Sequence, residues 1–165
     1  GPVSFLVGSA TDLPLEDECA DVALLLHVAM NIDDKAALFR EVARVLRPGG
    51  VFAVYDIMTG PEPGPLTHPL PWASVAETSF VAPRAEYVAA AEAAGLTLVA
   101  ERDRWQFGYG FMREMVDRSA AEGPPPLGPH LFMGDGAREK LVNLVADLAA
   151  RRVTPVELIF RKAGS

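Results

Sequence analysis

Cysteine, long apolar runs and excess positive charge are all scarce in this sequence of 165 residues, and each scarcity excludes a class of protein. Cys19 is the only cysteine, so no disulfide framework and no zinc cluster of thiolates can form within the chain. No run reaches the ~18 apolar residues of a membrane span, and no charged-then-apolar leader marks secretion. The net charge of −7 argues against nucleic-acid or membrane partners, which require a basic surface. We therefore expect a cytoplasmic protein.

What remains is the composition of an ordinary folded domain. Half of the residues are apolar and 22% are charged, which excludes a disordered chain. A chain of this length suits one hydrophobic core. We therefore predict a single α/β domain over residues 1–165.

The segment Asp21–Met58 carries the strongest structural pattern. Asp21–Val28 is apolar without alternation, as in a parallel strand that is covered on both faces. A helix with apolar residues at helical spacing follows, and Asp33 or Asp34 can cap it. Arg-Pro-Gly-Gly ends the helix, and Val51–Ile57 is a second apolar run. The segment predicts a parallel β-α-β unit, and ligands of such sheets bind at the carboxyl ends of the strands.

The rest of the sequence alternates between loops and elements. Thr59–Pro71 holds five prolines and two glycines, which predicts a long irregular loop of the kind that is functional or mobile. Pro155 should push the last strand toward an edge of the sheet or a bulge. In the helix expected at Trp105–Ala121, the side chains that should face inward are Phe107, Phe111, Met112 and Met115. The expected elements are strands over Val3–Val7, Leu96–Glu101 and Val153–Phe160, and helices over Pro83–Ala94 and Trp105–Ala121, with a last helix capped by Asp135.

Several short motifs then resemble one known family in their order along the chain. They are Gly-Ser-Ala-Thr-Asp-Leu-Pro at 8–14, Asp21-Val22, His27-Val28 and Leu-Arg-Pro-Gly-Gly at 46–50. The ordered set resembles class I S-adenosylmethionine-dependent methyltransferases, and it is most similar to the small-molecule branch with the ubiquinone/menaquinone and sarcosine-type enzymes. The resemblance implies a Rossmann-like mixed sheet that is flanked by helices, with S-adenosylmethionine lying across the strand ends.

The resemblance also implies the positions of the site residues. The loop with Ser9, Ala10 and Thr11 would hold the adenine of the cofactor. Ser9 stands where relatives carry an acidic or amide side chain, and Ala10 can offer its backbone N–H. His27 and Val28 would lie beside the methionine moiety. The residues expected to contact the substrate are Met30, Asn31 and Trp72.

Two expected parts of the family pattern are missing from this sequence. The glycine-rich loop after the family's first strand and the acidic residue that binds the ribose have no counterpart, because the two Gly-x-Gly pairs, at 108–110 and 134–136, do not follow strands. We therefore expect a truncated, incomplete methyltransferase fold without its first two strands and an incomplete cofactor site. The strand at Asp21–Val28 would then have an open edge, which predicts a homodimer, a swapped assembly or a partner segment on the N-terminal side.

His27 and Asp56 follow adjacent strands and have two interpretations. A hydrogen bond between them would make His27 an oriented catalytic base. Alternatively, the two form a structural polar pair that fixes the loops, since methyl transfer often needs only positioning. Trp72 could cover the substrate or fill the core. No residues at metal-ligand spacing accompany His68 or His130, so no metal is expected.

The function predicted from the sequence is methyl transfer from S-adenosylmethionine to an N, O or C nucleophile of a small molecule, impaired by the missing loop. A lid and substrate wall would come from Thr59–Pro71, Trp72 and the helix at Trp105–Met115. The alternative is a non-catalytic methyltransferase-like module that dimerises or docks on a partner. A nicotinamide dehydrogenase ranks last because the dinucleotide fingerprint is absent.

Overall fold

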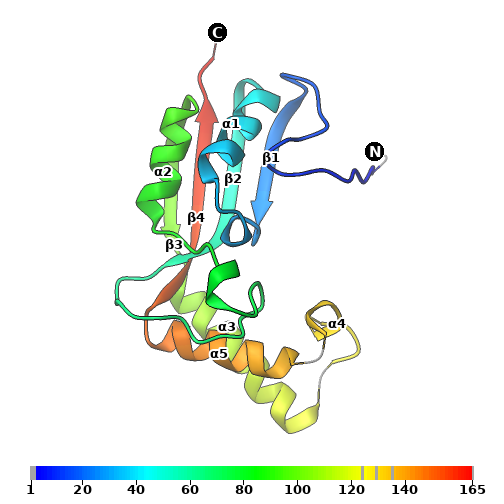
Figure 1. The fold of residues 1–165 in the computed structure, drawn as a ribbon, viewed down its shortest axis with the longest axis vertical. Helices are drawn as coiled ribbons and strands as arrows, with labels where there is room; N and C mark the ends of the chain where they lie inside the picture. Colours follow the sequence, from blue (N-terminus) through cyan, green and yellow to red (C-terminus); the bar gives the residue numbers. More distant parts are fainter. Residues whose placement is uncertain (1–2, 124, 129, 135, 165) are drawn as a thin grey trace.

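A four-stranded sheet forms the framework of the computed structural model, which describes residues 3–123, 125–128, 130–134 and 136–164. The strands are β1 (Ala20–Leu26), β2 (Leu46–Thr59), β3 (Leu96–Asp103) and β4 (Val153–Lys162). Their order is β1-β2-β4-β3, with β1 parallel to β2 and β4 antiparallel to both of its neighbours (Figure 1). The predicted α/β class with a Rossmann-like mixed sheet is confirmed.

The β-α-β unit forms as the sequence predicts. Helix α1 (Lys35–Val45) begins after Asp34, whose side chain accepts a hydrogen bond of 2.8 Å from the backbone N–H of Ala37. This cap satisfies one of the donors that a helix N-terminus leaves unpaired. The helix ends at Leu46, which is extended and starts β2. The two strands are thereby brought side by side with their carboxyl ends at the same edge of the sheet.

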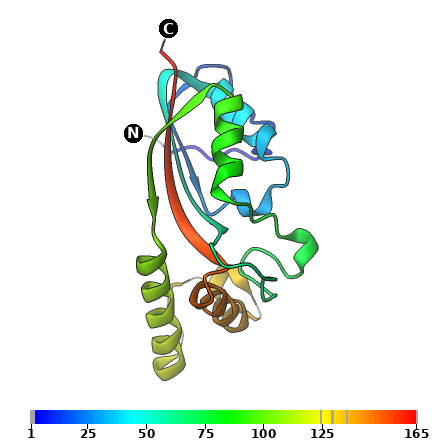
Figure 2. The ribbon, with the colours of Figure 1, turned by 90° about the vertical axis from the view of Figure 1, so that its left-hand side faces the viewer.

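One face of the sheet is covered by α1 and by α2 (Arg84–Ala93), which lie together on that side (Figure 2). Phe39 of α1 is fully buried and lies edge-on to the rings of Phe52, Tyr87 and Phe160, with centroid distances of 5.4, 6.1 and 5.7 Å. Edge-to-face aromatic packing adds to the stabilisation from burial. This aromatic cluster forms the centre of the larger of two hydrophobic cores.

The opposite face of the sheet differs from the prediction. Val22, Leu24 and Leu26 of β1 are 57, 66 and 58% exposed, although a strand without alternation was expected to be covered on both faces. Successive side chains of a strand point to opposite faces, so these three share one face. On that face α3 approaches β4 near Pro155, and the three side chains of β1 stay exposed. In Figure 2, α3 lies on the side of the sheet opposite α1 and α2. We refer to Val22, Leu24 and Leu26 as the open face of β1.

The prediction of a strand at Val3–Val7 is wrong. The segment has no strand pairing, and Phe5 and Val7 are essentially fully exposed. A strand exists only where a neighbour accepts and donates its backbone hydrogen bonds, and no such neighbour lies next to this segment in the described part of the chain. β1 is consequently an edge strand.

A second layer below the sheet holds α3 (Trp105–Glu122), α4 (His130–Met133) and α5 (Ala137–Ala149) (Figure 1). Two short 3-10 turns, η1 (Ala29–Asn31) and η2 (Ala76–Thr78), complete the elements. None of the helices in the described ranges combines the length and the apolar character of a membrane span. The predicted capping residue Asp135 lies outside the described residues, and Gly136 stands at the start of α5.

β4 is an interior strand, so the expectation that Pro155 places it at an edge is wrong. Pro155 pairs with Ile57 of β2 on one side, while the last pair with β3 joins Asp103 to Val156. Pro155 therefore lies just beyond the end of β3, where its missing N–H costs no ladder hydrogen bond.

The inward face of α3 also differs from the prediction. Phe107 and Phe111 are 58 and 56% exposed, whereas Gly108 is buried. A Cβ atom at Gly108 would lie 2.6 Å from the ring of Pro155. Helix α3 thus contacts β4 at Gly108, where the absence of a side chain allows the close approach. Phe107 and Phe111 do not take part in this contact and stay more than half exposed.

Candidate functional site

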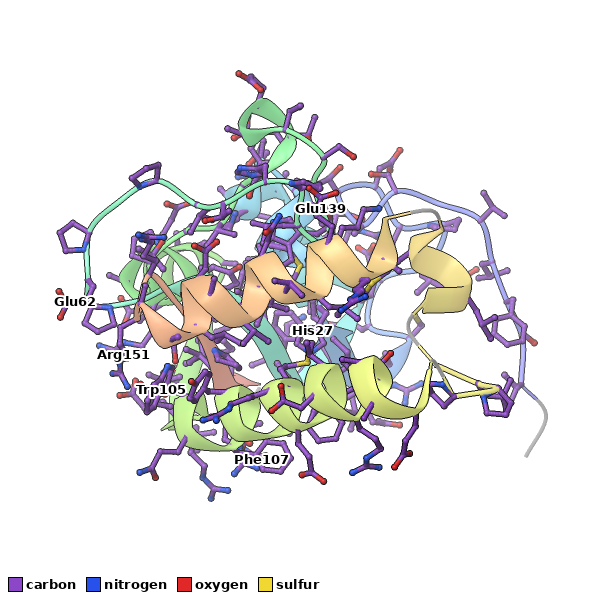
Figure 3. The ribbon with its side chains drawn as sticks, turned by 90° about the horizontal axis from the view of Figure 1, so that it is seen from below. His27, Glu62, Trp105, Phe107, Glu139 and Arg151 are labelled. Atoms are coloured by element: carbon purple, nitrogen blue, oxygen red, sulfur yellow. The ribbon has the colours of Figure 1, made fainter. Side chains whose placement is uncertain are left out.

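A cavity of about 600 Å³ lies between the sheet and the second layer. It opens at the carboxyl ends of β1 and β2, where ligands of parallel α/β sheets bind. In Figure 3, which views the molecule from below, His27 is seen between α3 and α5. The lining residues are His27, Met30, Asn31, Tyr55, Ile57, Pro71, Trp72, Phe107, Gly108, Phe111, Met112, Met133, Leu141, Leu144, Leu148 and Pro155.

Four of the residues predicted from the sequence line this one cavity: His27, Met30, Asn31 and Trp72. The expected wall from the Trp105–Met115 helix is present in Phe107, Phe111 and Met112. The sequence interpretation missed Tyr55 and the α5 side chains Leu141, Leu144 and Leu148. The helical spacing of these leucines is the signal that could have located α5, because Leu144 and Leu148 both pack in the smaller core and border the cavity.

His27 is held by its backbone at the end of β1. Its φ is +54°, a left-handed conformation that non-glycine residues rarely adopt. Its N–H donates to the carbonyl of Tyr55 at 2.9 Å, and its ring lies edge-on to the Tyr55 ring with centroids 5.0 Å apart. One side of the imidazole is exposed, while the surrounding walls desolvate it and lower its pKa below 6.5. The imidazole is therefore neutral at pH 7 and able to accept a proton.

Asp56 does not form the predicted hydrogen bond with His27 in the described structure. Asp56 and Tyr55 are successive strand residues and so point to opposite faces. The Asp56 carboxylate accepts hydrogen bonds from the Tyr87 hydroxyl at 3.1 Å and from the backbone N–H of Ile57 at 3.0 Å, on the helix-covered side. It is fully buried, and burial raises its pKa to about 6. Asp56 does not line the cavity.

Asp56 nevertheless touches the site through the backbone. The N–H groups of Ala29 and Met30 also point at its carboxylate and favour its charged form. These residues belong to η1, the turn that carries Met30 and Asn31 into the cavity. The carboxylate therefore fixes one wall of the cavity from behind.

The proline-rich loop is fastened to α5, which the sequence interpretation missed. Asp147 of α5 is fully buried and accepts hydrogen bonds from the backbone N–H and the hydroxyl of Thr67, at 2.9 and 3.1 Å. Arg152 donates to the same carboxylate at 3.0 Å. Trp72, at the end of the loop, is half-buried and donates its indole N–H to Ser79 at 2.9 Å. Both interpretations of Trp72 therefore apply, because it packs on the smaller core and borders the cavity.

The predicted adenine loop lies outside the cavity lining. The hydroxyls of Ser9 and Thr11 are 2.8 Å apart, the Thr11 N–H donates to the Ser9 hydroxyl at 3.2 Å, and Ala10 packs against the larger core. Hydroxyls and backbone amides fit the mixed donors and acceptors of an adenine edge. Val28, the last predicted cofactor contact, is 37% exposed beside His27. Within the described ranges, no cluster of His, Cys, Asp and Glu side chains could hold a metal ion.

Known proteins that are similar to this chain include several methyltransferases. Residues 1–54 match the model of the family described as "Methyltransferase domain". The chain is 31% identical over 121 residues to the ubiquinone/menaquinone biosynthesis C-methyltransferase UbiE of Caulobacter vibrioides, covering 73% of this chain and 42% of that protein. It is 46% identical over 55 residues to a phthiotriol/phenolphthiotriol dimycocerosates methyltransferase of Mycobacterium ulcerans, covering 33% of this chain and 21% of that protein.

Solved structures show the same fold at lower identity. The [4+2]-cyclase SpnF has a TM-score of 0.71 and 20% identity, covering 98% of this chain and 56% of that one. Geranyl diphosphate C-methyltransferase of Streptomyces coelicolor has a TM-score of 0.70 and 16% identity, covering 96% of this chain and 52% of that one. The chain spans about half the length of these proteins, or less. In sequence and in fold, it belongs with the class I S-adenosylmethionine-dependent methyltransferases.

Proposed function

We propose that the chain takes part in methyl transfer from S-adenosylmethionine to an N, O or C nucleophile of a small molecule, and that the reaction occurs at the mouth of the cavity. The observation that carries the proposal is the gathering of His27, Met30, Asn31 and Trp72 around one cavity at the carboxyl ends of β1 and β2. The cofactor, when bound, supplies an electrophilic methyl group on a sulfonium centre.

Each part of the chain has a role in this proposal. Ser9, Ala10 and Thr11 hold the adenine, while His27 and Val28 lie along the methionine end. Met30, Asn31 and Trp72 position the acceptor, which contributes by alignment and by the exclusion of water. S-adenosylmethionine, if bound there, would supply the methyl group to an acceptor that these residues hold in line with it. Where the acceptor carries a proton, neutral His27 takes it up.

Asp56 enters this proposal as a positioning residue. It contacts η1 from the buried side of the sheet and does not border the cavity, so it acts on the acceptor wall through Ala29 and Met30. The sequence has no glycine-rich loop at this site, and we therefore expect cofactor binding by this chain alone to be weak.

Titration calorimetry with S-adenosylhomocysteine tests the proposal. We expect weak but saturable binding by the wild-type chain. Ser9→Asp should bind roughly tenfold more tightly, because a carboxylate adds a charge-assisted hydrogen bond to the adenine amino group, worth ~1.4 kcal/mol. The matched control is Asp12→Ser, which changes charge in the same loop and should leave binding within about twofold, since rim charges contribute little. Absence of binding to both wild type and Ser9→Asp would contradict the proposal.

A second candidate function is a non-catalytic one, in which the chain associates with a second copy through β1. The open face of β1 supports it, because an edge strand with exposed apolar side chains is a template for pairing. The assembly would be a homodimer or a swapped dimer in which the two β1 edges pair.

Sedimentation equilibrium distinguishes this candidate from the first. We expect a dimer for the wild type and a monomer for Leu24→Lys, because a lysine on the open face must lose its hydration when the dimer forms. Val99→Lys is the matched control: Val99 is 52% exposed on β3, at the other edge of the sheet, and the variant should remain dimeric. A wild type that stays monomeric at all concentrations would contradict the second candidate.

A further inference from the structure

We infer that the cavity accepts an uncharged and mainly apolar acceptor, whose single polar group points toward His27, Tyr55 and Asn31. The inference rests on the proposed function and adds the chemical class of the acceptor. Three observations support it: the residues that line the cavity, the positions of their polar atoms, and the contacts of the cations on the neighbouring helices.

Among the residues that the structure describes, the lining contains no charged side chain. Of its sixteen residues, none is Asp, Glu, Lys or Arg. A phosphate, carboxylate or ammonium group placed against this wall would lose its hydration without gaining a partner, and burial of an unpaired charge is strongly unfavourable. The described wall therefore disfavours charged acceptors.

The polar atoms of the lining lie at one end. His27, Asn31 and Tyr55 stand at the carboxyl ends of the strands or in the turn that follows β1. Trp72 contributes only its ring, because its indole N–H is bonded to Ser79. The far end consists of apolar side chains from α3 and α5, among them Met112, Leu141 and Leu144. An acceptor that matches this polarity has an apolar body and one polar head.

Three cations on α3, on α5 or next to these helices make other contacts. The Lys140 ammonium donates to the carbonyl of Met133 at 2.9 Å. The Arg151 guanidinium lies 4.3 Å from the centroid of the Trp105 ring, and Figure 3 shows the two side by side at one end of α5. Arg104 lies over the ring of Phe107 at 5.0 Å. The two arginines therefore lie on aromatic rings, the lysine is bonded to a backbone carbonyl, and none of the three lines the cavity.

The nature of the apolar wall indicates a broad fit. Three lining residues are methionines, Met30, Met112 and Met133, whose flexible thioether side chains adapt to irregular shapes and contact aromatic rings favourably. The volume of about 600 Å³ lies within the range of small-molecule sites. The wall therefore suits ring systems and short hydrocarbon bodies.

The test compares two probes that share one body, 2-naphthol and 2-naphthyl phosphate, by titration calorimetry at pH 7.5 without cofactor. We expect 2-naphthol to bind at least about tenfold more tightly, the equivalent of ~1.4 kcal/mol. In Met112→Lys the order should reverse, because the variant places a cation in the wall that pairs with phosphate. Met112→Leu is the matched control and should keep the wild-type preference, since it conserves volume and polarity. Thermal melting of each variant checks that it folds.

Equal binding of the two probes, tighter binding of the phosphate, or no binding of either by the folded wild type would overturn the inference. An unchanged preference in folded Met112→Lys would also overturn it, because the probe would then bind elsewhere. The proposed function is judged separately by S-adenosylhomocysteine. Binding of that compound without a preference for 2-naphthol would leave the function standing and the acceptor class wrong, whereas the reverse result would leave an apolar site without methyl transfer.

Discussion

Phe39→Ala is expected to lower the free energy of unfolding by about 3–5 kcal/mol, the range observed when a buried aromatic side chain is truncated. Phe39 is fully buried, and its ring contacts three other aromatic rings that come from both neighbouring strands and from α2. Truncation removes the packing of all three contacts and leaves a cavity where α1 meets the sheet. Because domains retain only about 5–15 kcal/mol of stability in total, much of the chain would be unfolded at 37 °C.

Chemical denaturation followed by circular dichroism measures this loss. Phe39→Leu should cost considerably less, because it keeps most of the buried apolar volume. Phe111→Ala is the exposed counterpart: its ring is 56% exposed, and we expect a change below about 1 kcal/mol. A loss in Phe39→Ala no larger than in Phe111→Ala would contradict the central place of the aromatic cluster.

The second large effect concerns pH and Asp56. Burial raises the pKa of this carboxyl from 3.8 to about 6 in the folded chain, so the folded state binds a proton more tightly than the unfolded state does. Stability therefore falls as pH rises from about 4 to about 6, and it is constant with respect to this group above that range. A shift of about two units corresponds to roughly 3 kcal/mol.

The comparison of wild type with Asp56→Asn isolates this effect. The asparagine cannot ionise, so the unfolding free energy of wild type minus that of the variant should fall by about 2 kcal/mol between pH 4 and pH 6.5. Tyr87 and Lys35 interact with the carboxyl, and Glu86 and Asp33 interact in turn with Lys35. All four groups are present in both proteins. Urea denaturation at a series of pH values gives the difference, and a difference that is flat or rises with pH would show that Asp56 is not buried in this way.

The parts of the fold that sequence predicts best are those with a local signal. The helix α1 has an N-cap, a helical stripe and a stop, and all three are short-range features. The order of strands and helices after β1 follows from similar signals. Each of these features depends only on residues close together in the chain. They can therefore be predicted without knowledge of the tertiary structure.

The failures have long-range causes. The strand at Val3–Val7 requires a neighbour that the local pattern does not supply. The expected hydrogen bond of Asp56 to His27 depended on the face to which Asp56 points, and Tyr87, which lies 31 residues further along the chain, is its partner instead. Pro155 was assigned to an edge strand because a proline lacks the N–H that an interior strand needs. The local pattern does not reveal that β3 ends just before Pro155, since strand pairing sets that end. Sequence located four residues of the cavity by resemblance, but the contribution of α5 required the packed structure.

The hydrogen bonds of Thr67 to Asp147 couple the proline-rich loop to α5. The same buried carboxylate of α5 also accepts a hydrogen bond from Arg152. An engineer who wishes to reshape the cavity must therefore exchange the loop and the helix together. A loop transplanted alone would leave the buried side chain of Asp147 short of two hydrogen-bond donors. Substitutions in these two segments should accordingly be strongly non-additive, and libraries that vary both at once should yield folded variants that single-segment libraries miss.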